Sequence, residues 1–475
     1  MRHDSSAART AVLTRRRMLA GAFAFVGASV ALRSGALALE AGGGKAFDVR
    51  TYGVTPGDVS ADQARKNAQA IEQAILDAQA AGEGSVVQLP GGLILVHLDP
   101  ADYDDARSRY RTSAIRCPAS HIVIQGAGEA ATTLKNFHDG QDDYSYSVMQ
   151  LGVPPLDNGN FDNIGLTLRN MTLDGNHFFA RPENYRPELK TTSSAIRVEG
   201  LKACVFSDLT ITNAGGYAMG LQNGGYVDNR FERVTIRNTM ADGIDVKDNR
   251  GLGQGNVMIG VTVERFGLAA NRKDPFAGLD LMGRGWRLDG ITVKNWGQEG
   301  TPAAGLRFKQ GGPNSSRGNG AVGSVAKNVR IIGAPPKPGE KPWPAIGVHV
   351  KCEDITIDGL TVRDVAFGVI ASQPDLKLSH FDIEAWNAGF VQRDRESREQ
   401  VFDGADNSVL SDGAIKVTGD KGVGLDLRRP GAVVRSVKFD VPHGAGMAMR
   451  RAFPLDQSGA TFAAGTQKLL EAPAR

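Results

Sequence analysis

The sequence repeats one short phrase at intervals that are typical of a solenoid. In this phrase a Gly or Ala precedes an apolar residue, a variable residue, a second apolar residue and a second variable residue. The phrase begins at Ala195, Ala218, Gly243, Gly278, Gly305, Gly347, Gly368, Gly389, Gly424 and Gly446. The shorter spacings are 21 to 27 residues, and insertions lengthen the others. A repeat of this length indicates units that stack to share one core.

The residues between these phrases favour strands over helices. Second strands such as Asp208-Leu-Thr-Ile-Thr and Gly359-Leu-Thr-Val-Arg follow turns rich in Gly, Asn and Asp, and no helical pattern intervenes. The Leu and Asn skeleton of leucine-rich repeats is absent. We therefore predict an all-β solenoid, a right-handed parallel β-helix over residues 97–455, with a C-terminal tail over 456–475. Its coils would stack about 4.8 Å apart.

The alternation within the phrase predicts which side chains are internal. In a strand, residues two apart share a face, so the second and fourth positions face the core and the third and fifth face solvent. The predicted inward residues are Ile196, Val198, Met219, Leu221, Ile244, Val246, Leu279, Leu281, Leu306, Phe308, Val348, Val350, Leu425, Leu427, Met447 and Met449.

Residues 39–96 form a region of different character, which we interpret as a cap with the first coils. A helical stretch over about 64–81 places Ile71, Ile75 and Ala78 on one stripe, and the segment Val86-Val87-Gln88-Leu89-Pro90-Gly91-Gly92 follows it. This opening resembles that of the pectate-lyase-like β-helix family, which includes rhamnogalacturonases, polygalacturonases, phage tailspikes and epimerase-related proteins. The resemblance implies a helix that covers the N-terminal end of the solenoid, where an exposed strand edge would otherwise invite association.

The first 38 residues have the pattern of an export signal. A basic start precedes a moderately apolar run over 18–32 and a small-x-small cleavage site at Ala36-Leu37-Ala38. Thr14-Arg15-Arg16-Arg17-Met18-Leu19 resembles the twin-arginine signal. The resemblance implies a folded, exported protein that is periplasmic or secreted, and the cleavage site predicts a mature chain that begins near Leu39. An ordinary secretory leader and an anchor that stays attached are the alternatives. The apolar run is too short for a resident span, so we expect no membrane span in the mature chain.

The charge balance argues against a nucleic-acid partner. Of 55 basic and 52 acidic residues, six basic and one acidic lie in the first 38, which leaves 49 and 51. Proteins that bind nucleic acids need clustered Lys and Arg in excess to neutralise phosphates. Any basic patch on the mature chain must therefore be local.

Ionisable residues gather at the variable positions of four consecutive phrases. The third position gives Asp245, Asp280, Arg307 and His349, and the fifth adds Lys247, Lys309 and Lys351. We predict that these side chains share one solvent-facing cleft. The longest insertions, residues 266–277, 309–325 and 333–346, fall between these coils and would wall the cleft, with Arg272 within reach of a substrate.

A finer resemblance concerns the polygalacturonases. Asn238-Thr239-Met240-Ala241-Asp242-Gly243-Ile244-Asp245 is similar to that family's NTDGID with two extra residues, and Gly305-Leu306-Arg307-Phe308-Lys309 resembles its G-x-R-I-K. The resemblance implies that Asp242 is an acid and that Arg307 and Lys309 hold a substrate carboxylate. The chain lacks the family's GHG, and Phe276-Ala277 stands where its paired aspartates would lie.

These residues suggest an enzyme that cleaves an acidic, uronate-containing polysaccharide. We favour a β-elimination lyase, because Arg307, Lys309, Lys247, Lys351 and His349 supply a base and cations that stabilise a carbanion-like state. Asp245 and Asp280 would then hold Ca²⁺ through oxygen ligands. A glycoside hydrolase, a C5 epimerase and a non-catalytic glycan-binding β-helix are the alternatives.

Overall fold

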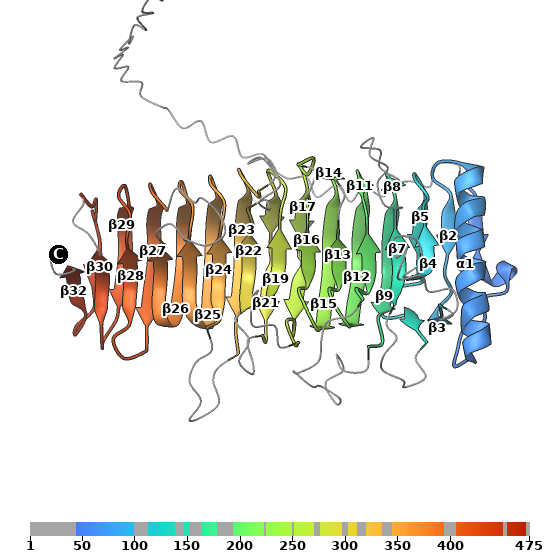
Figure 1. The fold of residues 1–475 in the computed structure, drawn as a ribbon, viewed down its shortest axis with the longest axis horizontal. Coiled ribbons are helices and arrows are strands. Elements are labelled where there is room, and N and C mark those ends of the chain that lie inside the picture. The colour runs from blue at the N-terminus through green and yellow to red at the C-terminus, as the bar shows by residue number, and fades with distance from the viewer. Residues whose placement is uncertain are drawn as a thin grey trace, which may run out of the picture. The chain divides into compact units, whose positions relative to one another are not determined.

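The described part of the chain winds into stacked parallel coils. The computed structural model describes residues 44–98, 113–137, 146–152, 163–177, 193–222, 225–248, 251–269, 276–296, 303–310, 320–334, 344–393, 405–449 and 454–471. Twenty-nine strands pair in one continuous sheet, and β8 (Asn163–Ile164), β11 (Leu201–Lys202) and β14 (Tyr226–Val227) form a small second sheet. The fold is the predicted right-handed parallel β-helix (Figure 1). The predicted export signal, residues 1–38, lies outside the described residues.

One side of the solenoid, which we call the site sheet, carries the repeated phrase. Each of its strands pairs in parallel with the next coil. Its strands are β4 (Ser113–Cys117), β7 (Ser147–Leu151), β10 (Ile196–Val198), β13 (Met219–Leu221), β16 (Ile244–Val246), β19 (Phe276–Leu281), β22 (Ala303–Phe308), β24 (Ile346–Val350), the second halves of β25 (Thr356–Ala371) and β26 (Lys377–Gln392), β28 (Val423–Leu427), β30 (Ala445–Met449) and β32 (Gln467–Glu471).

The remaining strands of the large sheet, with the first halves of β25 and β26, complete the coils. They are β1 (Ala46–Asp48), β2 (Val86–Gln88), β3 (Gly92–Val96), β5 (Val123–Gln125), β6 (Thr132–Asn136), β9 (Thr167–Asp174), β12 (Val205–Ala214), β15 (Arg230–Thr239), β17 (Val257–Ile259), β18 (Thr262–Glu264), β20 (Arg287–Asp289), β21 (Thr292–Lys294), β23 (Val325–Ile332), β27 (Val409–Val417), β29 (Val433–Asp440) and β31 (Thr461–Phe462).

One bend of each coil, within or between these strands, is made by a left-handed residue. The bend residues lie in register from coil to coil, with φ between 49° and 80°. Asn, Asp and Gly adopt this conformation at the lowest cost, which explains why most of the bends use them. The bend residues are Asn170, Asp208, Arg233, Gly260, Gly290, Asn328, Gly359, His380, Asp412 and Ser436.

The interior is the predicted apolar core. All sixteen predicted inward residues are exposed by 8% or less, which confirms the alternation. The Gly that opens eight of the ten phrases stacks closely on the next coil, because a Cβ on Gly347 would lie 2.4 Å from the carbonyl oxygen of Gly368. A Cβ on Gly243 would lie equally close to the carbonyl oxygen of Gly278. Adjacent coils therefore touch backbone to backbone at this position.

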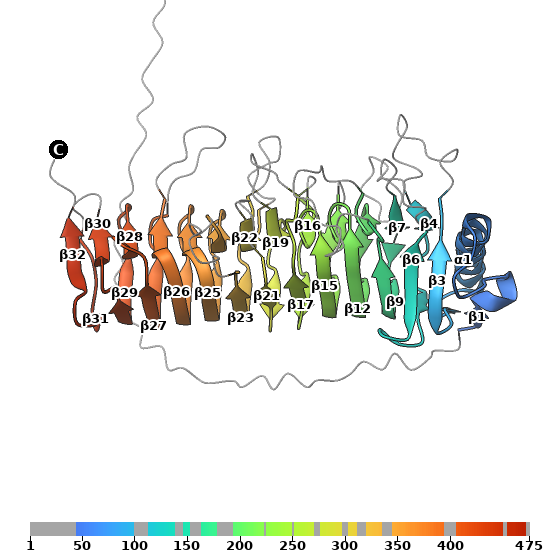
Figure 2. The ribbon, with the colours of Figure 1, turned by 90° about the horizontal axis from the view of Figure 1, so that it is seen from below.

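The helix α1 (Ala61–Ala81) covers the N-terminal end of the stack, after the short 3-10 helix η1 (Val49–Tyr52). The Ser60 hydroxyl caps the helix by accepting a hydrogen bond from the backbone N–H of Gln63. Its apolar stripe, which includes Ile71, Ile75 and Ala78, is buried, and α1 contacts β1 to β4 (Figure 2). The capping helix is confirmed, and it begins three residues before the predicted stretch.

The C-terminal end differs from the prediction. β31 pairs with β29, and β32 pairs with β30, so the β-helix continues to Glu471 instead of ending at residue 455. The predicted tail is therefore largely a further coil, which the sequence obscured because the phrase is not repeated there. In the described residues, no helix is long and apolar enough to cross a membrane.

Candidate functional site

The four predicted site residues form one column across the site sheet. Asp245 on β16 pairs with Asp280 on β19, Asp280 pairs with Arg307 on β22, and Arg307 pairs with His349 on β24. Their apolar neighbours on the same strands point into the core, so all four side chains lie on the outer face, as predicted.

The prediction that these side chains face solvent is wrong. Asp245 and Asp280 are each 1% exposed, His349 is 4% exposed and Arg307 is 8% exposed. Part of the cover comes from the site itself, because the lysines at the fifth position reach back over the carboxylates. The outward residues Ile370 and Val391 of the next coils are also buried, in a second apolar cluster outside the core. The side chains at the third phrase position therefore lie on the outer face of the sheet but beneath other side chains.

Asp280 is held by two cations. The Arg307 guanidinium donates from Nε to Oδ1 at 2.7 Å and from Nη2 to Oδ2 at 2.5 Å, and the Lys309 ammonium donates to Oδ2 at 2.9 Å. Burial acts to raise the pKa of Asp280, but Arg307 and Lys309 outweigh burial and hold the pKa below its ordinary value. The same partnership raises the pKa of Arg307 and of Lys309 against the effect of burial. Asp280 is therefore ionised at neutral pH.

Asp245 is held on one oxygen only. Its Oδ2 lies 3.0 Å from the Lys247 ammonium and accepts a hydrogen bond from the Gln222 amide at 3.0 Å. Its Oδ1 has no hydrogen-bond partner among the described residues, and it lies 3.9 Å from the Lys309 ammonium. A buried, unpaired carboxylate oxygen is costly, which marks Oδ1 as a place where a ligand group would be received.

Asp242 has a different environment from the other two acids. It precedes β16 and accepts a hydrogen bond from the backbone N–H of Ala277. The segment around Ala269 pairs with the chain just before Asp242, and Met240, Ala241, Ala269 and Phe276 form a small apolar cluster there. Burial and the nearby charges of Asp280 and Asp245 raise the pKa of Asp242 to about 8. Asp242 is therefore mostly protonated at neutral pH.

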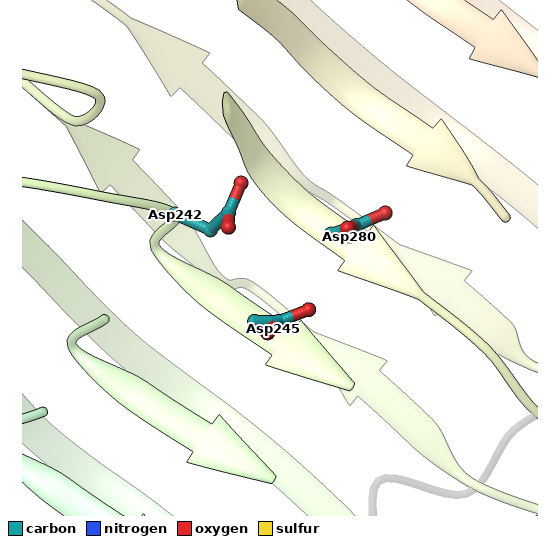
Figure 3. Close-up of side chains that lie close together, drawn as sticks. All are labelled: Asp242, Asp245 and Asp280. Carbon is teal, nitrogen blue, oxygen red and sulfur yellow. The ribbon is translucent and has the colours of Figure 1, made fainter. Parts of the chain in front are cut away.

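The three carboxyl groups lie close together (Figure 3). One oxygen from each of Asp242, Asp245 and Asp280 lies within 4.8 Å of the others, and all three residues are buried. The set fits Ca²⁺ poorly, because Ca²⁺ takes six to eight oxygen ligands and three cations already occupy this cluster. The arrangement instead combines a protonated carboxyl group, that of Asp242, with an ionised one, that of Asp280, and this combination is typical of sites for acid–base catalysis.

His349 continues the column beyond Arg307. Its Nε2 lies 3.5 Å from the Ser372 hydroxyl, and its Nδ1 has no hydrogen-bond partner among the described residues. Burial and the neighbouring cations Lys351, Arg393 and Arg307 hold the pKa of His349 well below its ordinary value. The imidazole is therefore neutral at neutral pH.

Two residues complete the site that sequence reasoning did not select. Gln222 holds Asp245 and occupies the same phrase position as Lys247 one coil earlier, so the repeat contained the signal. The Tyr217 hydroxyl accepts a hydrogen bond from the Lys247 ammonium at 3.3 Å. Tyr217 precedes the repeated phrase, so no pattern in the sequence pointed to it. The predicted binding residue Arg272 lies outside the described residues.

Comparisons with known proteins extend the fold assignment. The sequence matches no protein-family model and no curated protein. Among solved structures, the N-terminal fragment of bacteriophage Phi29 gene product 12 matches 88% of this chain and 71% of its own, with 14% identity and a TM-score of 0.53. This chain spans 61% of the Geobacillus virus E2 protein ORF18.

Two carbohydrate-active proteins match more loosely. The GH87 α-1,3-glucanase of Streptomyces thermodiastaticus is 14% identical over 89% of this chain and 70% of its own, with a TM-score of 0.45. The A-module of the Azotobacter vinelandii mannuronan C-5 epimerase AlgE4 is 13% identical over 89% and 98%, with a TM-score of 0.39. With TM-scores below 0.5 these two likenesses carry no argument, so the function is argued from the site.

Proposed function

We propose that this protein cleaves a polysaccharide by hydrolysis at Asp242, Asp245 and Asp280. The observation that carries the proposal is the opposite protonation of neighbouring carboxyl groups, with the pKa of Asp242 raised to about 8 and that of Asp280 lowered. Glycoside hydrolysis needs this pairing, because one carboxyl group must give a proton while another stays ionised.

The first step is donation of a proton by Asp242. The glycosidic C–O bond breaks as the carboxyl group of Asp242 passes its proton to the departing oxygen. The apolar cluster around Phe276 favours the protonated form of Asp242 before the step. The charge of the ionised Asp280 also favours the protonated form of Asp242 before the step.

The second role falls to Asp245. Its Oδ1 either takes a proton from an attacking water or bonds to the anomeric carbon, and both routes need an oxygen without a cation bound to it. Lys247 and Gln222 hold the other oxygen and fix the orientation of the carboxylate. If Asp245 acts as the base, it ends with the proton of the water and Asp242 without one, so exchange with solvent restores the starting state. If Asp245 bonds to the anomeric carbon, Asp242 takes the proton of the water that displaces Asp245, and the starting state returns directly.

β-Elimination is the second candidate, favoured by the neutral His349 next to cationic Arg307. In that reaction His349 would take the proton beside a uronate carboxylate, and C5 epimerisation would begin in the same way. Arg307 is a poor base, because both of its donor nitrogens that face Asp280 are engaged and its pKa is raised. Because His349 would be the base, elimination would not need Asp242.

One experiment separates the candidates. The mature chain from Leu39 is assayed on acidic and neutral polysaccharides for new reducing ends and for the absorbance of unsaturated uronates. We expect reducing ends without absorbance, and a loss of about 10² to 10⁴ in rate in Asp242→Asn and Asp245→Asn. The control Asp354→Asn changes an exposed acid on another turn and should keep the parent rate. Absorbance with an active Asp242→Asn would establish elimination, and binding without turnover would establish a binding protein.

A further inference from the structure

Two more buried oxygens on the outer face of the site sheet lack a hydrogen-bond partner. They are Oε1 of Gln150, which lies on β7, and Oε2 of Glu199, which directly follows β10. Gln150 is 2% exposed and Glu199 is 1% exposed, and no group of the described residues donates to either oxygen. A buried acceptor without a donor destabilises a folded protein, so each one needs a physical reason.

Both side chains point away from the core. Gln150 pairs with Arg197 on β10, and its neighbours Met149 and Leu151 belong to the core. Glu199 follows Arg197 by two residues, so both lie on the same face of the strand. The Arg197 guanidinium donates to Oε1 of Glu199 at 2.6 Å. That ion pair engages one oxygen of Glu199 and leaves the other without a donor.

The two oxygens lie on the same side of the solenoid as the unpaired oxygen of Asp245. β7, β10, β13 and β16 are successive strands of the site sheet. With coils stacked about 4.8 Å apart, Glu199 lies about 10 Å from Asp245 along the solenoid, and Gln150 lies about 14 Å from it. The unpaired acceptors therefore form a series that begins at the three carboxyl groups and runs toward β7.

The coil between Glu199 and Asp245 has no side chain at the third position. Gly220 stands there, and an added Cβ would lie 2.7 Å from the Ser194 hydroxyl and 3.1 Å from the Tyr217 ring. Ser194 and Tyr217 are half-buried, so a hydroxyl and part of an aromatic ring reach the surface beside Gly220. Sites for small organic ligands commonly combine aromatic side chains with a few placed polar groups.

We infer that Gln150 and Glu199 accept hydrogen bonds from hydroxyl groups of a sugar unit on the β7 side of the cleaved bond. The inference rests on the proposed function, because it takes the three carboxyl groups as the point of cleavage. Carboxylate and sulfate groups have no hydrogen to donate, so an acidic group at this place would leave both oxygens unpaired. The unit bound here is therefore a neutral sugar with free hydroxyl groups.

The unpaired oxygens make this a specificity site with a distinctive effect on stability. A site that hydrogen-bonds a substrate hydroxyl rejects an analogue without that hydroxyl, because the buried polar groups of the site then stay unpaired. The ligand-free protein already contains these unpaired acceptors, and a bound sugar would satisfy them. Gln150→Leu should therefore have opposite effects, stabilising the ligand-free protein and weakening the complex.

Affinity and melting temperature together test this combination. In an Asp242→Asn background, calorimetry measures binding of oligosaccharides cut from cellulose, starch, polygalacturonate and alginate, and of their O-methylated forms. We expect a neutral oligosaccharide to bind better than its O-methylated form. Gln150→Leu should weaken binding of that oligosaccharide by about tenfold, leave the O-methylated form unaffected and raise the melting temperature of the ligand-free protein. Glu199→Gln should weaken binding with the same selectivity.

Two control variants test the role of the acceptor itself. Gln150→Glu keeps an acceptor oxygen, flanked by Arg116 and Arg197 on adjacent coils, and should retain binding. Ser85→Ala removes another buried, unpaired oxygen, next to β2 and outside the site sheet, and should bind as the parent does.

The results also separate this inference from the proposed hydrolysis. Binding of none of the four oligosaccharides, or of the acidic pair alone, would overturn the sugar-binding role of Gln150 and Glu199. Equal losses for free and O-methylated forms, or a lower melting temperature of Gln150→Leu with unchanged binding, would overturn it as well. Reducing ends released by the parent, with unchanged affinities in both variants, would refute this role and leave hydrolysis standing. Selective binding through Gln150 without any release of reducing ends would refute hydrolysis alone.

Discussion

Arg307 holds both carboxylate oxygens of Asp280 in a two-pronged ion pair between adjacent coils, with nitrogen–oxygen distances of 2.7 and 2.5 Å. Both residues are nearly excluded from solvent. Such planar, two-point contacts are stronger than single hydrogen bonds and fix the orientation of both groups. The pair connects β19 to β22 beneath the lysines and gives the cluster of carboxyl groups its fixed geometry.

Removing Arg307 should destabilise the fold as well as the site. Arg307→Ala leaves Asp280 buried with Lys309 as its remaining cation, and breaking a buried pair costs about 3 kcal/mol or more of the free energy of unfolding. Urea denaturation of variant and parent measures this cost. The comparison variant Arg237→Ala breaks an exposed pair with Glu264 and should cost less than about 1 kcal/mol. Equal costs would show that the buried pair adds nothing beyond a surface pair.

The pH dependence of the rate should follow Asp242. Its pKa is about 8, so the proton needed for hydrolysis is lost as the pH rises through that value, and the rate should fall on this alkaline limb. Asp280 stays ionised well below its ordinary pKa, so it should not limit the rate at mildly acidic pH. Initial rates between pH 5 and about 9.5 check this, since the ordinary range of carboxyl pKa values lies lower.

The free energy of unfolding should also depend on the titration of Asp242, and the raised pKa fixes the direction of that dependence. Between the unfolded pKa of Asp242, near 3.8, and about 8, the folded state binds more protons than the unfolded state, so the free energy of unfolding falls as the pH rises. Asp242→Asn cannot titrate. The stability of the variant relative to the parent should therefore increase from pH 4 to about 8 and then level off. A difference that does not change with pH would contradict the raised pKa.

The opening Gly of the phrase should not tolerate a methyl group. Gly347→Ala places a Cβ 2.4 Å from the carbonyl oxygen of Gly368, and such overpacking costs about 1 to 3 kcal/mol. Gly91→Ala is the control, because its Cβ would meet the carbonyl oxygen of Ala131 at an ordinary 3.6 Å. Thermal unfolding of both variants checks the difference, and similar melting temperatures would refute the close stacking.

Calcium should be dispensable. Arg307, Lys309 and Lys247 already neutralise the carboxylates that sequence analysis assigned to Ca²⁺. EDTA or added Ca²⁺ should therefore leave the rate and the melting temperature of the mature protein unchanged. A rise in melting temperature with Ca²⁺ that is lost in Asp245→Asn would restore the metal site.

Export through the twin-arginine route is a separate proposal. It rests on Arg15, Arg16 and the Ala36-Leu37-Ala38 site. Replacing both arginines by lysine should leave uncleaved precursor in the cytoplasm, as seen by fractionation and immunoblotting. Unchanged export would show that another route carries the protein.

The sequence alone determined the coil register and the direction of the side chains. A strict period of two separates Ile244 and Val246 from Asp245, and a register slip of one residue would bury a charge in the core. The repeated Gly and the Asn, Asp and Gly bends fixed where each coil begins and turns. Each of these constraints acts within one short segment, so the segment's own sequence predicts it without knowledge of the other coils.

Only the tertiary structure decided the electrostatic state of the site. The spacing of the repeated phrase predicts that Asp280 lies beside Arg307. It does not predict the two-point ion pair between them, or that Oδ1 of Asp245 lacks a hydrogen-bond partner among the described residues. The raised pKa of Asp242 depends on an apolar cover that comes partly from Ala269 and Phe276, more than 25 residues along the chain. Desolvation and charge pairing depend on every group packed around a carboxyl, and those groups come together only when the coils stack.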